Sequence, residues 1–135
     1  MGQALAKREV QDGIRLYHLH QHEAAIRKWR RALHRKSNRT HRFLTLGYLA
    51  TAHCEFGRYR DMLAYSVMQI EIANEVENPV MRVEAYLNLA RSNERLCEYH
   101  KAVSYSRHCL QNKPSDIRTY GYIYLTQVCE SFNIN

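Results

Sequence analysis

Histidines and cysteines are the residues of this chain with the most versatile chemistry, but their spacing does not assemble a site. His18, His20 and His22 alternate, so on a helix their side chains would splay around the axis and share no ligand face. We expect them to mark the end of a first helix and its turn. His53 and Cys54 are adjacent, and nothing pairs them as a catalytic dyad. The chain has no GxSxG, HExxH, P-loop or GxGxxG motif, so the sequence predicts no catalytic residue, no metal site and no cofactor.

The four cysteines lie 43, 12 and 20 residues apart, at Cys54, Cys97, Cys109 and Cys129. These gaps suggest neither a disulfide framework nor a zinc ribbon. We interpret the cysteines as reduced thiols of a cytosolic protein. No run approaches the ~18 apolar residues that a membrane span needs, and no signal peptide opens the chain.

Small residues recur along the chain at the period of a helical repeat. Gly13, Ala50 and Ala90 are 37 and 40 residues apart. A tetratricopeptide repeat (TPR) is a pair of helices, A and B, of about 34 residues with small residues where two helices approach closely. The observed spacing is slightly longer, so the helices or their connections are expected to be extended.

The helices of these pairs have recognisable faces and boundaries. Ala25, Trp29 and Ala32 recur with a helical period, which predicts that Trp29 is buried in the first pair. Gly57 is expected to end one helix and Tyr59 to begin the next.

We therefore predict an all-α fold, an α-solenoid of three TPR helix pairs plus a C-terminal capping helix, in a single domain over residues 1–135. The expected repeats cover about 5–38, 41–77 and 80–113, and a lone helix of a fourth repeat covers about 115–132 after a cap at Ser115-Asp116. An irregular helical bundle is the alternative. The half-repeat suggests a fragment or a short isoform, whose last helix covers the third repeat.

Positive charge is concentrated in the first third of the chain. Residues 1–42 carry a net charge of +8, and residues 43–135 carry −1. We define the basic segment as eight residues: Arg27, Lys28, Arg30, Arg31, Arg35, Lys36, Arg39 and Arg42. Three interpretations stay open: a solvated helix face, a membrane-surface patch and a nucleic-acid surface. No helix-turn-helix, RRM or zinc-finger pattern supports nucleic-acid binding.

Two stretches are more specific than a generic repeat. Residues 51–59 read TAHCEFGRY and residues 86–101 read YLNLARSNERLCEYHK. Together with Met1-Gly2-Gln3, they resemble the N-terminal TPR region of the rapsyn family, and the resemblance runs to about residue 112.

The resemblance implies a non-enzymatic cytoplasmic scaffold that clusters acetylcholine receptors on the inner face of the postsynaptic plasma membrane. It also implies a myristoylated N-terminus and self-association through the TPR array. The implied partners are a second copy of the chain, the acetylcholine receptor or associated cytoskeletal and signalling proteins, and an anionic membrane surface. The family's receptor contacts, coiled coil and RING-type zinc domain belong to more C-terminal parts, which are absent from these residues.

The N-terminus itself suggests a lipid anchor. Met1-Gly2 matches the start of an N-myristoylation sequence, in which Gly2 carries the acyl chain. The Ser or Thr expected later in that sequence is replaced by Ala6. A single myristoyl chain binds membranes only marginally, so the basic segment would be the second signal.

The concave groove of a TPR array is lined mainly by the first helix of each pair. In the third repeat the groove candidates are Glu84, Leu87, Arg91, Glu94 and Arg95. The first two repeats offer Val10, Ile14, Tyr17, Leu44, Thr51 and Glu55. An alternative is that Arg91 and Arg95 only pair with nearby glutamates at helical spacing.

A peptide-binding adaptor of the co-chaperone type is the alternative function. Such adaptors hold a peptide carboxylate with a clamp of Lys, Asn and Arg. The matching positions here carry Ile14, Tyr48 and Glu84, so that clamp is not expected.

Overall fold

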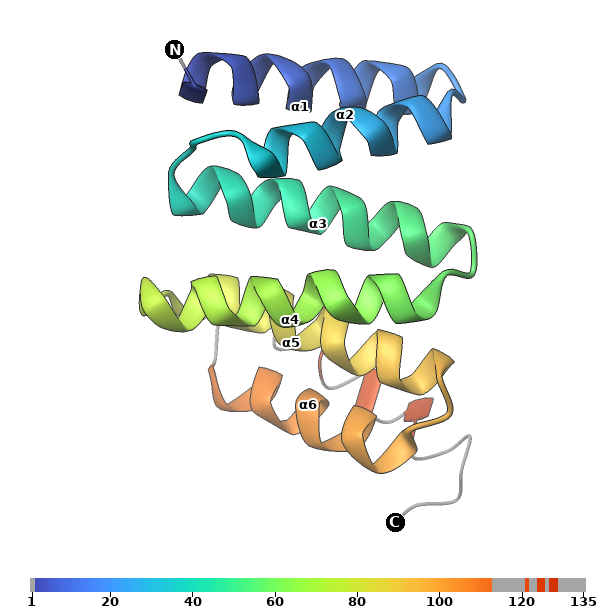
Figure 1. Ribbon diagram of the computed structural model, residues 1–135. Helices are drawn as coiled ribbons and strands as arrows, with labels where there is room; N and C mark the ends of the chain where they lie inside the picture. The colour runs from blue at the N-terminus through green and yellow to red at the C-terminus, as the bar shows by residue number, and fades with distance from the viewer. Residues whose placement is uncertain (1, 113–120, 122–123, 126, 129–135) are drawn as a thin grey trace.

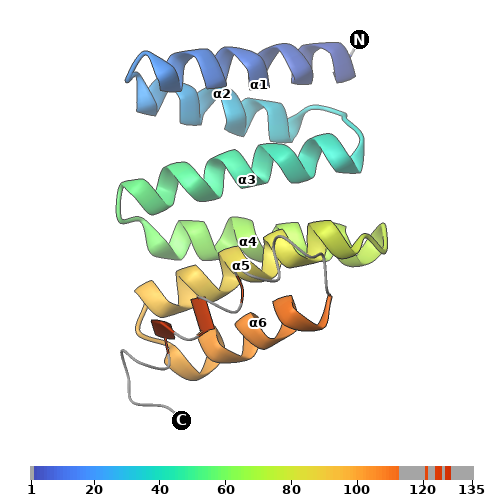
Figure 2. The same cartoon turned by 180° about the vertical axis from the view of Figure 1, so that it is seen from behind.

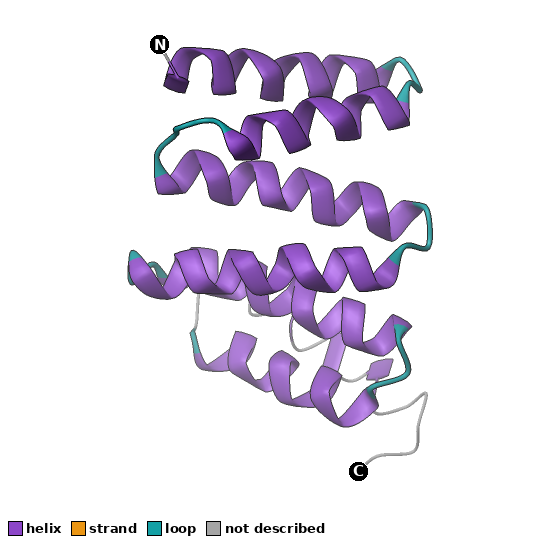
Figure 3. Cartoon of the chain, in the orientation of Figure 1, coloured by secondary structure: helices purple, strands orange, loops and turns teal. Residues whose placement is uncertain are grey.

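The computed structural model describes residues 2–112, 121, 124–125 and 127–128, and these residues form helices and no strands (Figure 3). The predicted all-α class is confirmed. The helices are α1 (Gly2–His18), α2 (His22–His34), α3 (Arg39–Glu55), α4 (Tyr59–Glu75), α5 (Pro79–Arg95) and α6 (Tyr99–Gln111).

The helices stack in chain order, and each packs against the next (Figure 1). Their connections alternate between two edges of the stack, as Figure 2 shows from behind. We call the edge with the α1–α2, α3–α4 and α5–α6 turns the turn edge. The opposite edge, with the start of α1 and the α2–α3 and α4–α5 connections, is the N-terminal edge. Three helix pairs therefore form a solenoid.

The turns within the three pairs share one backbone conformation. His20, Gly57 and Cys97 have φ of 61°, 72° and 64°, in the left-handed region. The following residue donates its N–H to a carbonyl five residues back, at 2.9, 2.8 and 2.8 Å. This bond belongs to the Schellman motif, which satisfies the last carbonyls of a helix. The three turns lie 37 and 40 residues apart, the same period as the small residues.

The connections between pairs begin the next helix with an asparagine cap. Asn38 Oδ1 accepts from the His41 N–H at 2.7 Å, and Asn78 Oδ1 accepts from the Met81 N–H at 3.1 Å. Pro79 occupies the first turn of α5, where a missing N–H costs nothing. These caps fix where the first helix of the second and third pairs begins.

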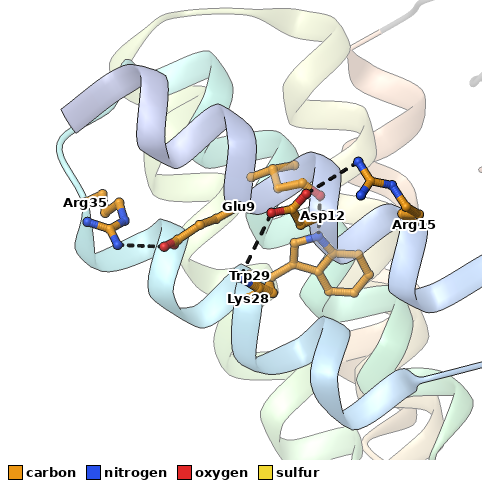
Figure 4. Close-up of polar contacts among 7 residues, drawn as sticks. Glu9, Asp12, Arg15, Lys28, Trp29 and Arg35 are labelled. Carbon is orange, nitrogen blue, oxygen red and sulfur yellow. Dashed lines mark hydrogen bonds and ion pairs between the residues drawn. The ribbon is translucent and has the colours of Figure 1, made fainter. Parts of the chain in front are cut away.

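Trp29 is the centre of the first pair. Its side chain is 2% exposed, and its Nε1 donates to the Val10 carbonyl at 3.1 Å (Figure 4). A Cβ added to Gly13 would lie 2.7 Å from Trp29 Cδ1, so only glycine allows this approach. Ala25 and Ala32 are also buried. The predicted phase of α2 is confirmed.

Polar residues replace the aromatic residues usual in the second helix of a TPR pair. Ser66 and Ser106 are fully buried, and their hydroxyls donate to the carbonyls of Met62 at 2.7 Å and Ala102 at 2.9 Å. Each hydroxyl is satisfied inside its own helix, so burial leaves no unpaired donor.

The described residues of the last segment are helical and cover the third pair. Val128 is 2% exposed and packs with Ala102 and Val103. Tyr124 donates its hydroxyl to the Ala90 carbonyl at 3.3 Å. The predicted cap at Ser115-Asp116 and the ends of the predicted helix 115–132 lie outside the described residues.

Replacing Trp29 tests the packing of the first pair. Trp29→Ala should lower the free energy of unfolding by about 3–5 kcal/mol, because it leaves a large cavity and removes the hydrogen bond from the indole to the Val10 carbonyl. Trp29→Phe keeps most of the volume and should cost less. Thermal and urea denaturation measure both, and a Trp29→Ala protein as stable as wild type would contradict this packing.

The turns give a second test, because two of them hold a side chain at positive φ. His20→Gly and Cys97→Gly should each raise the free energy of unfolding by up to about 1 kcal/mol by relieving that strain. Gly57→Ala should lower it by about 1 kcal/mol for the same reason. Denaturation curves in which Gly57→Ala is as stable as wild type, or in which His20→Gly and Cys97→Gly are less stable than wild type, would show that φ does not control the stability of these turns.

Candidate functional site

Five of the eight residues of the basic segment contact other parts of the chain. The ion pairs are Lys28–Asp12 at 4.0 Å, Arg35–Glu9 at 2.6 Å and Arg39–Glu75 at 3.2 Å. Arg42 donates to the Leu33 carbonyl at 2.6 Å, and Arg30 donates to the Tyr65 hydroxyl at 3.4 Å. Much of the segment therefore connects helices.

The Glu9–Arg35 pair ties the middle of α1 to the end of α2 (Figure 4). Glu9 is 8% exposed, and its carboxylate accepts from the Arg35 guanidinium, which raises the pKa of Arg35. A buried carboxylate without this partner would be costly. Arg35 is thus a structural residue, although the sequence alone places it in the surface patch.

Arg27, Arg31 and Lys36 are the remaining members of the segment. They are exposed and make no ion pair within 4.0 Å among the described residues. Arg27 and Arg31 are four residues apart on α2, so they share one solvent-facing side of that helix. We call Arg27, Arg31 and Lys36 the free cations.

Gly2 begins α1 at the N-terminal edge, directly against the α2–α3 connection. A Cβ added to Gly2 would lie 3.2 Å from Lys36 Cβ and 3.4 Å from the Lys36 carbonyl oxygen. Lys7 acts on the same region: the pKa of His41 is lowered by burial and, to a smaller extent, by the Lys7 charge. The fold thus brings the predicted lipidation residue next to a free cation 34 residues away in sequence.

A cavity of about 600 Å³ lies between α3, α4 and α5, and Tyr124 and Gln127 also line it. Five of the predicted groove residues line it: Leu44, Thr51, Glu84, Leu87 and Arg91. The sequence-based phase missed Gln69 and Asn88, which line it too, and Tyr48 was considered only as a clamp position.

A smaller cavity of about 280 Å³ continues this groove toward α1. Its lining is mostly aromatic and apolar: Ile14, Tyr17, His18, Trp29, Tyr48 and Thr51. Trp29 and Tyr48 stack with their ring centroids 5.3 Å apart. Tyr48 and Thr51 line both cavities, so the two form one groove along the stack.

Other predicted groove residues lie elsewhere. Val10 is 6% exposed because it packs in the core beside Trp29, so its predicted place in the groove is wrong. Glu55, Glu94 and Arg95 line neither cavity. Arg95 Nε lies 3.5 Å from the carboxylate of Glu94, its neighbour in sequence, which is not the helical spacing of the ion-pairing alternative.

The histidines that alternate in sequence do not share a helix. His18 ends α1 and His20 lies in the turn, as predicted, whereas His22 begins α2. The His22 ring packs edge-on against Tyr17 and Phe56 at 4.4 and 5.2 Å. No group of three metal-binding side chains is found among the described residues.

The comparisons with known proteins identify the family. The family model described as "Rapsyn N-terminal myristoylation and linker region" matches residues 1–80. The chain belongs to the rapsyn family.

Two curated relatives extend the match. The "43 kDa receptor-associated protein of the synapse" of Gallus gallus is 48% identical over 110 residues, which cover 82% of this chain and 27% of that protein. The protein of the same name from Tetronarce californica is 41% identical over 118 residues, covering 87% and 29%. The chain thus spans less than a third of the length of these relatives. No solved structure matches it.

The family description bears on the N-terminal edge. It names a myristoylation region, and the matched residues 1–80 contain Gly2 and the whole basic segment. None of the described helices is both long and apolar enough to cross a bilayer.

Paired variants separate the structural arginine from the free cation beside it. Arg35→Gln should lower the melting temperature, because it leaves the largely buried Glu9 carboxylate without its ion pair. Lys36→Gln removes the same charge one residue later and should leave the melting temperature unchanged. Circular dichroism melts measure both, and equal effects would contradict the division of the basic segment into structural and free residues.

Proposed function

We propose that this chain is a non-enzymatic scaffold module of the rapsyn type, attached to the cytoplasmic face of a membrane at its N-terminal edge. The observation that carries this proposal is the contact between Gly2 and Lys36. It lets one short stretch of surface present an acyl chain and a cation to the same bilayer. Gly2 is the proposed acylation site.

The acyl chain and the free cations together would bind a membrane much more strongly than the acyl chain alone. A myristoyl chain alone binds a bilayer with an association constant of roughly 10⁴ M⁻¹. Each Lys or Arg near an anionic surface adds about 1 kcal/mol. Three free cations would then add about 3 kcal/mol, or roughly a hundredfold in affinity. The other five basic residues would add less because their side chains are engaged within the fold.

The partners follow from the relatives and the family. The relatives are named as receptor-associated proteins of the synapse. We propose that this chain serves the same kind of assembly, beneath a postsynaptic membrane that contains the acetylcholine receptor and its cytoskeletal and signalling proteins. The chain supplies membrane attachment and a rigid helical array to that assembly.

The proposed self-association uses the turn edge. Leu19 and Phe56 occupy the same position in the first two turns, and their side chains are 60% and 42% exposed. Large apolar side chains repeated along one edge favour contact with a second copy.

Membrane attachment is tested with protein co-expressed with an N-myristoyltransferase, checked by intact mass and floated with anionic vesicles. Acylated wild type should float, and Gly2→Ala should not. Because an added Cβ would crowd Lys36, unacylated wild type serves as the control for Gly2→Ala. Replacing Arg27, Arg31 and Lys36 by Gln should lower vesicle binding about a hundredfold at low salt and flatten its salt dependence.

The matched control replaces three exposed cations elsewhere, Arg60, Lys101 and Arg107, by Gln and should reduce binding much less. Duplex DNA is titrated in parallel over the same salt range. An unacylated Gly2, flotation indifferent to the free cations, or tighter binding to DNA than to vesicles would refute the proposed attachment.

Self-association is tested by sedimentation velocity at micromolar concentration. The chain should sediment as a dimer or larger species, above the 16.0 kDa of the monomer. Leu19→Ser should shift it toward monomer, whereas Val80→Ser, also exposed but at the N-terminal edge, should not. A monomer at every concentration would rule out self-association of this chain.

A further inference from the structure

A buried amide fixes the orientation of Asn88 in the concave groove. Gln69 is 2% exposed, and its Nε2 donates to the Phe43 carbonyl at 3.3 Å. A carbonyl only accepts, so the Gln69 side-chain oxygen must be on the other side, where it accepts from Asn88 Nδ2 at 2.8 Å.

This network leaves Asn88 with free hydrogen-bonding capacity. One N–H of its amide is used by Gln69, and its Oδ1 accepts no hydrogen bond among the described residues. The remaining N–H and the Oδ1 can pair with the C=O and N–H of one peptide unit. Because Asn88 lines the larger cavity, this N–H and Oδ1 are available to a ligand bound there.

Arg91 lies on the same side of α5, three residues after Asn88, and lines the same cavity. It makes no ion pair within 4.0 Å in the described part of the chain. Its guanidinium makes one long contact, 3.9 Å from Nη2 to Cys54 Sγ. A guanidinium without a carboxylate partner at the wall of a groove is complementary to an acidic ligand.

Glu84 gives the groove a polarity. It lines the cavity seven residues before Arg91, about 10 Å along the helix. Burial raises its pKa, and Glu84 makes no ion pair within 4.0 Å among the described residues. A carboxylate ligand is therefore accommodated at the Arg91 end and disfavoured at the Glu84 end. The opposite wall is apolar, with Leu44 49% and Tyr48 37% exposed.

We propose that this groove binds an extended peptide of a partner protein that carries a carboxylate side chain and an apolar side chain. Arg91 binds the carboxylate, Asn88 binds the peptide main chain, and the Leu44–Tyr48 wall receives the apolar side chain. This inference rests on the proposed scaffold function and gives that scaffold a binding site separate from its membrane edge.

The test uses the 135-residue chain and fluorescein-labelled nine-residue peptides, acetylated and amidated, in a Ser/Ala background. Each peptide has one Leu and one Glu, separated by one to four residues, with matched peptides in which Gln or Lys replaces Glu. Fluorescence anisotropy should show binding at one spacing, about tenfold weaker with Gln and weaker still with Lys.

Variants assign the contacts. Arg91→Gln should abolish the preference for Glu over Gln, whereas Arg107→Gln, the same charge change on α6, should preserve it. Asn88→Ala should lower the affinity for the Glu and Gln peptides equally, and a thermal melt checks that this variant is folded. In the wild type, shifts of the Gln69 and Asn88 side-chain amide resonances on peptide addition report binding without any mutation.

Failure to bind any peptide at millimolar concentration, or equal affinity of wild type and Arg91→Gln for the Glu peptide, would overturn the proposal. It would also be overturned if Arg91→Gln changed the sedimentation of the chain alone, because the groove would then hold a second copy. Vesicle flotation reports the proposed membrane attachment independently of all these outcomes.

Discussion

The close contact between Gly13 and Trp29 is the constraint on which the first helix pair depends. Because Gly13 has no side chain, the indole lies against α1 and donates to the Val10 carbonyl. This contact fixes the register of α1 on α2. The same register places Glu9 beside Arg35 and Gly2 beside Lys36, toward the N-terminal edge. The other side of the indole forms part of the small cavity. The core of the first pair, the N-terminal edge and the groove therefore all depend on this one contact.

The fold divides the positive charge of the first third into two kinds. Arg35, Arg39 and Arg42 contact α1, α4 and the end of α2, where they join helices that follow one another along the chain. Arg27 and Lys36 stay in solvent. A charge used in a structural contact is already partly compensated, so it contributes less to the long-range attraction of an anionic surface. The cations held in these contacts are therefore less available for binding than the exposed ones.

The sequence predicted the fold well because its signals are local. The period of small residues located the three helix pairs, and the spacing of Ala25, Trp29 and Ala32 gave the buried face of α2. Contacts between distant residues were not predictable: nothing marks Glu9 and Arg35, 26 residues apart, as partners. Helix phase found seven of the residues that line the groove: Ile14, Tyr17, Leu44, Thr51, Glu84, Leu87 and Arg91. Gln69 and Asn88 were missed because their role depends on a hydrogen bond between two helices.

The N-terminal edge and the groove are geometrically separate. α5 begins at that edge with Pro79, and Asn88 lies nine residues later, about 14 Å along the helix. A bilayer contacting the helix ends would therefore leave the middle of the groove in solvent. At the N-terminal edge, the second pair carries Glu75 and Glu77. Among the described residues, Arg39 forms an ion pair with Glu75 and not with Glu77. An anionic surface would repel Glu77, so the first pair would approach the membrane most closely and the later repeats would point away. Membrane attachment and peptide binding in the groove are thus compatible in one molecule.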